Sequence, residues 1–384
     1  LFFLLLPFGQ TTANGNDSIR LSLLTCAPGE EIYSLFGHTA IRYEDPANGI
    51  DAVFNYGLFS FNTPNFIFRF SLGETDYQLG ATDYAHFAAE YAFDGRSVWQ
   101  QTLNLSKEEK AELIRLLQEN YRPENRVYRY NFFYDNCATR PRDKIEESII
   151  GKVIYPSEPQ DGSRSFRDIV HQYCKGHPWA RFGIDLCIGS EADRPITQRQ
   201  MMFAPFYLMD AFAGAQIAND SIQRPLVSDK ALIVDAVSDE EEGGWMPTPL
   251  QCSLLLFILT AAATIYSLRK RTGLWGVDLV LFGTAGIVGC VLAFLALFSE
   301  HPAVSSNFLL LVFHPGQFLF LPYIIYCVRK GKKCWYLTLN LIVLTLFIAF
   351  FPLIPQRFDF AVVPLALCLL IRSASNLILT SKKK

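Results

Sequence analysis

The sequence predicts an α+β domain with a mainly antiparallel sheet, followed by an all-α transmembrane bundle of about five helices. Two observations lead to this fold class. Short alternating segments separated by turn residues occur within residues 18 to about 240, and long apolar runs occupy most of the chain after them. Half of the 384 residues are hydrophobic, only 18% are charged, and most of the charge lies before residue 245. The net charge of −3 argues against a nucleic-acid partner.

Three regions are expected along the chain: a signal-peptide remnant at 1–17, an extracytoplasmic domain at 18–245, and a transmembrane domain at 246–384. Residues 1–9, LFFLLLPFG, are typical of the apolar core of a secretory signal. A short buried strand or a frayed terminus is the alternative. An acidic run followed by Gly243 and Gly244 indicates a linker before the membrane domain.

Alternating β-branched and aliphatic residues predict strands over 19–25, 35–43 and 51–58. The second and third flank the turn-forming sequence Asp-Pro-Ala-Asn-Gly and therefore predict an antiparallel hairpin. A further strand is expected over 96–105. A helix should follow it, because Ser106 and Glu109 have the spacing of a capping box.

Five apolar segments approach the roughly 20 residues that span a bilayer. They lie at about 250–268, 274–298, 307–327, 335–354 and 360–379. Lys and Arg cluster after the first, third and fifth segments, whereas the other two connections contain only Arg357. The positive-inside rule therefore places the C-terminus in the cytoplasm and the N-terminal domain outside it.

Two polar interruptions stand out among these segments. Arg372 lies in the last one, near enough to its cytoplasmic end for the side chain to snorkel to the interface. His314-Pro315-Gly316 breaks the third. This break is expected to be a kink or short re-entrant piece buried among helices, with contact to a lipid headgroup as the alternative.

The strongest candidate for a catalytic residue is Cys137. It follows an aromatic strand-like run and a turn-prone Asp-Asn pair, and it precedes a helix-like segment. A thiol at a helix start is stabilised as thiolate by the helix dipole. Asn136 or Thr139 is expected to cap that helix. His38 is the candidate base, and Asn55, on the returning hairpin strand, is the candidate orienter. A structural cysteine and a satisfied core histidine are the alternatives.

Other cysteines and histidines give weaker signals. Cys26 is a second candidate nucleophile. His171, Cys174, His177 and Cys187 match the spacing of no common zinc site, so no metal or cofactor is expected. Cys174 and Cys187 either form a disulfide or remain unpaired.

Six phenylalanines lie between residues 54 and 70, at positions 54, 59, 61, 66, 68 and 70. This density is too high for an ordinary solvent-facing surface. The run is expected to be either hydrophobic core or a groove for an acyl chain.

Four sequence blocks carry a family resemblance: LLTCAPGEEIYSLFGHTAIRYEDP, VFNYGLFSF, YNFFYDNCATRPRDKI, and GSEADRPIT followed by FAPFYLMDAF. Together with the multi-span tail, they resemble the Lnb family of bacterial lipoprotein N-acyltransferases. The resemblance implies a permuted papain-like, NlpC-type periplasmic domain, with Cys137 as the acyl-carrying nucleophile and His38 as its base. It also implies an inner-membrane location.

The expected reaction moves a fatty acyl chain from a phospholipid or other glycerolipid ester, through a thioester on Cys137, to the α-amine of a diacylglyceryl-modified lipoprotein. Backbone N–H groups at the helix start near Cys137 are expected to stabilise the oxyanion. Two alternatives are a thiol peptidase or amidase acting on cell-wall peptides, and a non-catalytic membrane-tethered binding protein.

Overall fold

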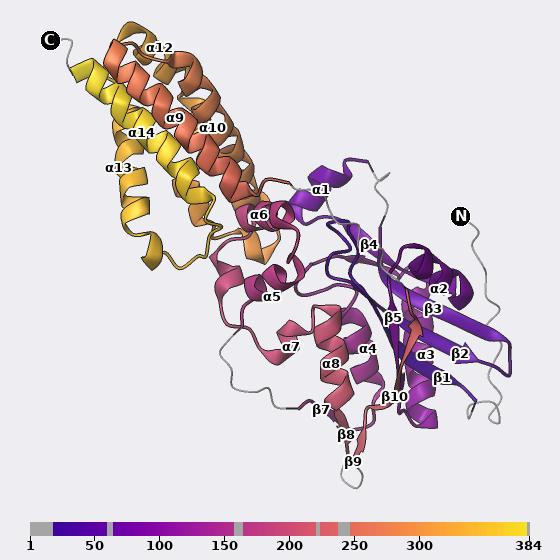
Figure 1. Cartoon of the computed structure of the whole chain (residues 1–384). Helices are drawn as coiled ribbons and strands as arrows, with labels where there is room; N and C mark the ends of the chain where they lie inside the picture. Colours follow the sequence, from indigo (N-terminus) through magenta and orange to yellow (C-terminus); the bar gives the residue numbers. More distant parts are fainter. Residues whose placement is uncertain (1–17, 60–63, 157–163, 220–222, 237–245, 382–384) are drawn as a thin grey trace. The chain divides into compact units, whose positions relative to one another are not determined.

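The computed structural model describes residues 18–59, 64–156, 164–219, 223–236 and 246–381 (Figure 1). The chain divides into two compact units. One is rich in sheet and contains residues 74–163 and 196–241 together with the N-terminal 70 residues. The other is helical and contains residues 71–73, 164–195 and 242–384. The predicted signal segment, residues 1–17, lies outside the described residues.

A seven-stranded sheet with the order β10-β5-β1-β2-β3-β4-β6 forms the first unit, and every neighbouring pair is antiparallel. Its strands are β1 (Arg20–Cys26), β2 (His38–Asp45), β3 (Ile50–Leu58), β4 (Asp76–Asp83), β5 (Val98–Leu103), β6 (Val127–Arg129) and β10 (Val227–Val234). A small second sheet contains β7 (Lys152–Ile154), β8 (Gln216–Ala218) and β9 (Gln223–Pro225). The mainly antiparallel sheet predicted from the sequence is confirmed, including the β2–β3 hairpin.

Apolar residues on both faces of the large sheet are covered by helices, because successive side chains of a strand point to opposite faces. Leu21 and Leu23 of β1 belong to the larger core, whereas Leu24 and Cys26 belong to the smaller one. The larger core packs against α3 (Lys107–Tyr121), α4 (Thr139–Ser148) and α8 (Pro205–Gly214); the smaller packs against α2 (Tyr84–Phe93). The predicted capping box of Ser106 and Glu109 begins α3. Two short helices, α1 (Phe66–Leu72) and α7 (Gln198–Met201), complete the elements of this region.

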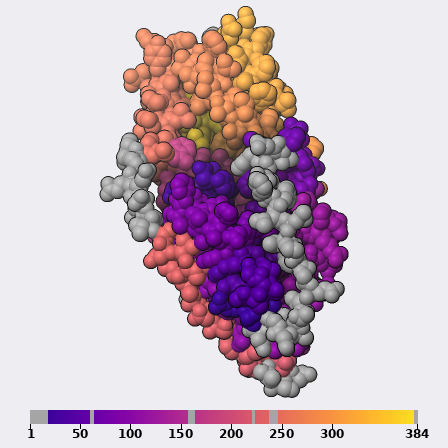
Figure 2. All heavy atoms as spheres, turned by 90° about the vertical axis from the view of Figure 1, so that its right-hand side faces the viewer, coloured from indigo at the N-terminus to yellow at the C-terminus, as the bar shows by residue number. Residues whose placement is uncertain are grey.

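The helical unit contains α5 (Phe166–Tyr173), α6 (Pro178–Cys187), α9 (Pro249–Lys270), α10 (Trp275–Phe298), α11 (Pro315–Leu319), α12 (Leu321–Lys330), α13 (Trp335–Ala349) and α14 (Val362–Ser381). Among the described residues, α9, α10 and α14 are each long and apolar enough to cross a membrane. Helices α12 and α13, bent by 111° at their break, raise the number to four if they are counted as one span. The predicted segments 307–327 and 335–354 are thus built from shorter helices. The orange to yellow spheres in Figure 2 belong to helices of this unit.

Arg372 does not snorkel to the interface. Its side chain is fully buried and forms an ion pair with Asp278 of α10, with Nε 2.7 Å from Oδ1 and Nη2 3.0 Å from Oδ2. Thr264 accepts a further hydrogen bond from Arg372, and Asn376 donates one to Asp278. A carboxylate at the same depth removes the need to reach water, so the arginine remains among the helices.

The break at His314-Pro315-Gly316 lies against neighbouring helices. His314 precedes α11, and its ring lies 3.3 Å from the hydroxyl of Tyr336 on α13. Gly289 of α10 allows the close approach, because a Cβ there would lie 2.5 Å from the His314 backbone. The break therefore packs against α10 and α13, with its three residues half-buried.

Candidate active site

The β2–β3 hairpin brings His38 and Asn55 together. His38 is the first residue of β2, and Asn55 lies on β3 in register with Ala40. Nε2 of His38 lies 3.2 Å from Oδ1 of Asn55, and Nδ2 of Asn55 lies 3.4 Å from Oγ1 of Thr82. An amide oxygen only accepts hydrogen bonds, so Nε2 of His38 carries the hydrogen and Nδ1 is left able to accept a proton.

Burial, with a smaller contribution from the charge of Arg96, lowers the pKa of His38 to about 4, although the hydrogen bond that His38 donates to Asn55 acts in the opposite direction. The imidazole is therefore neutral at pH 7. A neutral imidazole with a fixed tautomer can act as a general base.

Cys137 lies in a tight turn that is held by its neighbour Asn136. Oδ1 of Asn136 accepts hydrogen bonds from the backbone N–H groups of Ala138, at 2.8 Å, and Thr139, at 3.0 Å. Its amide nitrogen donates to the carbonyl oxygens of Phe132 and Phe203. Of the two expected caps, Asn136 thus satisfies the N–H groups at the start of α4, whereas Thr139 is already the first helical residue.

The thiol of Cys137 meets the sheet where the β2–β3 ladder ends. That ladder stops at Ala40 and Asn55, and a bulge containing Gly57 follows on β3. A Cβ on Gly57 would lie 3.5 Å from Cβ of Cys137. The backbone N–H of Thr39, the residue after His38, acts to lower the pKa of the Cys137 thiol. The two candidate catalytic residues therefore lie at the same end of β2.

Burial raises the pKa of the Cys137 thiol to about 11, although the nearby backbone N–H groups of Thr39 and Cys137 act in the opposite direction. At neutral pH the Cys137 thiol is therefore protonated and the His38 imidazole is neutral. This differs from the thiolate that the helix start predicts, because the loss of hydration at the sulfur outweighs the helix dipole.

The N–H groups expected to stabilise an oxyanion are largely in use. Those of Ala138 and Thr139 donate to Asn136 Oδ1, and that of Arg140 donates to the Asn136 carbonyl. The first turn of α4 therefore has few donors to offer a substrate. Asn136 is a positioning residue that the sequence indicated only as a possible helix cap.

Family models match both units. The Lnb N-terminal periplasmic domain matches residues 10–161, and the Lnb transmembrane domain matches residues 240–384. The chain belongs to the Lnb family. It is a membrane protein with a periplasmic N-terminal domain, and its predicted Lnb-type fold class is confirmed. No curated protein and no solved structure matches the chain.

The remaining thiols of this Lnb-family chain are less suited to catalysis. Cys26 is fully buried, and burial raises its pKa to about 12. Cys174 and Cys187 are both free, so the structure contains no disulfide between them. His171 bonds to Asp185 at 2.9 Å, and no group of three or more potential metal ligands occurs within the described part of the chain.

The phenylalanine-rich segment of the Lnb periplasmic domain divides into core and surface. Phe54 and Phe66 are buried, and Phe59 packs between Phe66 and Tyr77. Phe68 and Phe70 of α1 are exposed by 57% and 44%. Phe61 lies outside the described residues. The expectation of hydrophobic core is therefore confirmed for Phe54 and Phe66, whereas the acyl-chain groove stays a prediction.

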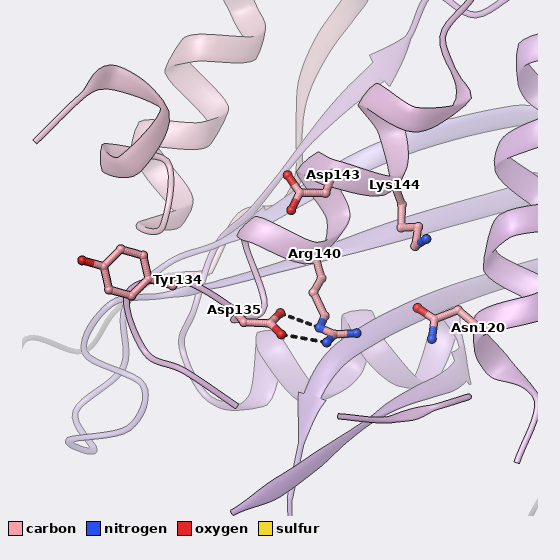
Figure 3. A pocket seen from close by; sticks show the side chains of 6 residues that line it. All are labelled: Asn120, Tyr134, Asp135, Arg140, Asp143 and Lys144. Atoms are coloured by element: carbon pink, nitrogen blue, oxygen red, sulfur yellow. Dashed lines mark hydrogen bonds and ion pairs between the residues drawn. The ribbon is translucent and has the colours of Figure 1, made fainter. Parts of the chain in front are cut away.

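A separate polar hollow of about 410 Å³ lies beside α4 (Figure 3). It is lined by Asn120, Tyr134, Asp135, Arg140, Asp143 and Lys144. Arg140 forms a two-pronged ion pair with Asp135 at 2.6 and 2.8 Å, and Lys144 bonds to Glu147 at 2.8 Å. Its cations are thus neutralised within the protein, and its lining is unlike an acyl-chain site.

Proposed function

We propose that this protein is a lipoprotein N-acyltransferase of the bacterial inner membrane, with Cys137 as nucleophile, His38 as base and Asn55 as the residue that orients His38. Membership of the Lnb family supports the reaction class. The observation that carries the site assignment is that Cys137 lies against Gly57 of β3, two residues beyond Asn55, which bonds to His38.

In the first half-reaction, Nδ1 of His38 removes the thiol proton as the sulfur attacks the carbonyl carbon of a glycerolipid ester. The carbon–sulfur bond forms, and the carbonyl π electrons move onto oxygen. Collapse of this intermediate breaks the ester carbon–oxygen bond. The leaving alkoxide takes the proton from His38, which yields a lysolipid and a thioester on Cys137.

In the second half-reaction, the α-amine of a diacylglyceryl-modified lipoprotein attacks the thioester carbonyl. The carbon–nitrogen bond forms, the carbon–sulfur bond breaks, and the proton lost by the amine passes through His38 to the departing sulfur. The acceptor leaves as an N-acylated lipoprotein, and the free thiol is restored.

Two features favour lipid substrates over the cell-wall peptides of the alternative peptidase function. Both reactants are held at a bilayer, and the protein carries its own transmembrane domain. Phe68 and Phe70 also present exposed apolar surface in the periplasmic region of the chain. Incubation with muropeptides should release no amine, whereas incubation with phospholipid should release lysolipid.

Replacement of the native gene by the Cys137→Ala variant tests the proposal in cells. Mass spectrometry of lipoproteins should show loss of the N-acyl group. Cys187→Ala is the matched control, because Cys187 is also a free, partly exposed thiol whose pKa is raised by burial. Unchanged N-acylation in Cys137→Ala would refute the proposal, and so would equal loss in both variants.

A further inference from the structure

A buried hydroxyl beside the candidate nucleophile has no bonding partner. Tyr128 of β6 is only 7% exposed, and its Oη forms no hydrogen bond with any residue that the structure describes. A buried hydroxyl without a partner is unfavourable, because it loses its bonds to water and gains none. Phenylalanine would fill the same space without this penalty. The hydroxyl therefore calls for a role beyond packing.

The Tyr128 hydroxyl and Cys137 lie close to the same point beside Gly57. A Cβ on Gly57 would lie 3.9 Å from Oη of Tyr128 and 3.5 Å from Cβ of Cys137. The hydroxyl and the cysteine therefore flank one point. Gly57 has a φ of 92°, a conformation that favours glycine, and its missing side chain leaves that point open.

The ring of Tyr128 is held in place from two sides. The guanidinium of Arg140 lies 3.5 Å from the ring centroid, and Asp135 fixes that guanidinium by its two-pronged ion pair. The ring of Tyr56 contacts Tyr128 edge-on, with centroids 6.3 Å apart. Burial raises the pKa of Tyr128, and negative charge on Cys137 raises it further, so its hydroxyl keeps its proton at neutral pH.

We propose that the Tyr128 hydroxyl donates a hydrogen bond to the oxyanion that forms when Cys137 attacks the ester carbonyl. This inference rests on the proposed acyltransferase function and adds a catalytic residue to it. Because Asn136 occupies the N–H groups of Ala138 and Thr139, the start of α4 offers few donors to an oxyanion. Tyr128 supplies one that is preorganised, buried and not engaged elsewhere in the resting site.

Thioester formation in the purified full-length protein tests this role. The Tyr128→Phe variant is incubated with a short-chain phosphatidylcholine, and acylated Cys137 is followed by intact-protein mass spectrometry. The rate at saturating lipid should fall by about 10²-fold, the usual effect of removing one oxyanion donor. The lipid concentration at half-saturation should stay unchanged, and so should alkylation of Cys137 by iodoacetamide, because neither involves an oxyanion.

Tyr56→Phe is the matched control. Tyr56 is fully buried in the same cluster, but its hydroxyl donates to Asn120 at 2.8 Å. Tyr56→Phe should lower the melting temperature and leave thioester formation within a few-fold of wild type. Tyr128→Phe should instead slow thioester formation and leave the melting temperature unchanged.

The outcomes separate this inference from the proposed function. If wild-type protein forms no thioester on Cys137, the acyltransferase assignment itself fails. If wild type reacts and Tyr128→Phe reacts equally fast, the oxyanion role is refuted. Equal loss in Tyr128→Phe and Tyr56→Phe would also refute it, because both hydroxyls would then act only through the fold.

Discussion

Nε2 of His38 lies 3.2 Å from Oδ1 of Asn55 across the β2–β3 hairpin. This bond selects the tautomer in which Nδ1 is free of hydrogen and able to accept the thiol proton. Asn55→Ala should therefore slow thioester formation by about 10- to 100-fold, part of the usual contribution of a general base. Asn48→Ala, in the turn of the same hairpin, is the control and should react like wild type. Equal rates in Asn55→Ala and wild type would show that the bond has no role in the reaction.

The pH dependence of Cys137 alkylation reports the state of the thiol. With a pKa raised to about 11, the thiolate fraction grows about tenfold per pH unit through the neutral range. Alkylation by iodoacetamide, measured on the Cys137 peptide between pH 6 and 9, should rise throughout that range. A rate that levels off below pH 8 would instead indicate a thiolate–imidazolium pair at rest.

Removing one partner of the buried ion pair between Asp278 and Arg372 should strongly destabilise the helical unit. Asp278→Asn leaves an uncompensated buried guanidinium, and breaking such a pair costs about 3–5 kcal/mol. The variant should melt at a clearly lower temperature in detergent. The double variant Asp278→Leu/Arg372→Met should recover most of the loss, because no buried charge remains. Failure of the double variant to recover would mean that the polar network itself is required.

Arg357, between α13 and α14, holds the segment 164–195 within the helical unit. It bonds to Asp168 and Asp193, and also to Ser165. Burial alone would raise the pKa of Asp168, but the bonds from Arg357 and Ser165 outweigh burial and lower it to about 2. Arg357→Ala should therefore increase proteolysis within 164–195. Arg194→Ala removes only an exposed ion pair with Glu191 and should leave proteolysis unchanged.

The stabilisation from the ion pair between Asp168 and Arg357 should depend on pH. Its pKa in the folded protein lies below the ordinary value of 3.8, so its stabilising effect is complete above that value. The effect is lost as pH falls towards 2. Wild-type protein should therefore lose its protease resistance in 164–195 below pH 3.8, whereas Arg357→Ala should change less over that range. Parallel curves for the two proteins would contradict the assignment.

Local sequence patterns were sufficient to predict the β2–β3 hairpin, the start of α3 and the long apolar helices. Alternation, a turn sequence and a capping box act over a few residues, so one sequence contains them in full. Strand β10 was missed because it joins the sheet beside β5, more than 100 residues away in sequence. The partner of Arg372 was missed for the same reason, since Asp278 is 94 residues distant.

The candidate site was predictable in its residue types but not in its electrostatics. Local context was enough to predict that His38 and Asn55 meet, and they do bond across the hairpin, whereas the catalytic roles of Cys137, His38 and Asn55 stay predictions. Desolvation of the Cys137 thiol depends on packing around the whole turn, which no short pattern encodes. That the Tyr128 hydroxyl lacks a hydrogen-bond partner among the described residues can likewise be recognised only from the three-dimensional structure.

Trapping the acyl-enzyme tests the central claim most directly. Purified protein is incubated with phospholipid in the absence of lipoprotein acceptor, quenched in acid, digested and mapped by mass spectrometry. The account predicts one hydroxylamine-sensitive acyl group on the Cys137 peptide, absent from Cys137→Ser and strongly reduced in His38→Ala. An acyl group on another residue, or equal acylation of the wild type and the His38→Ala variant, would contradict it.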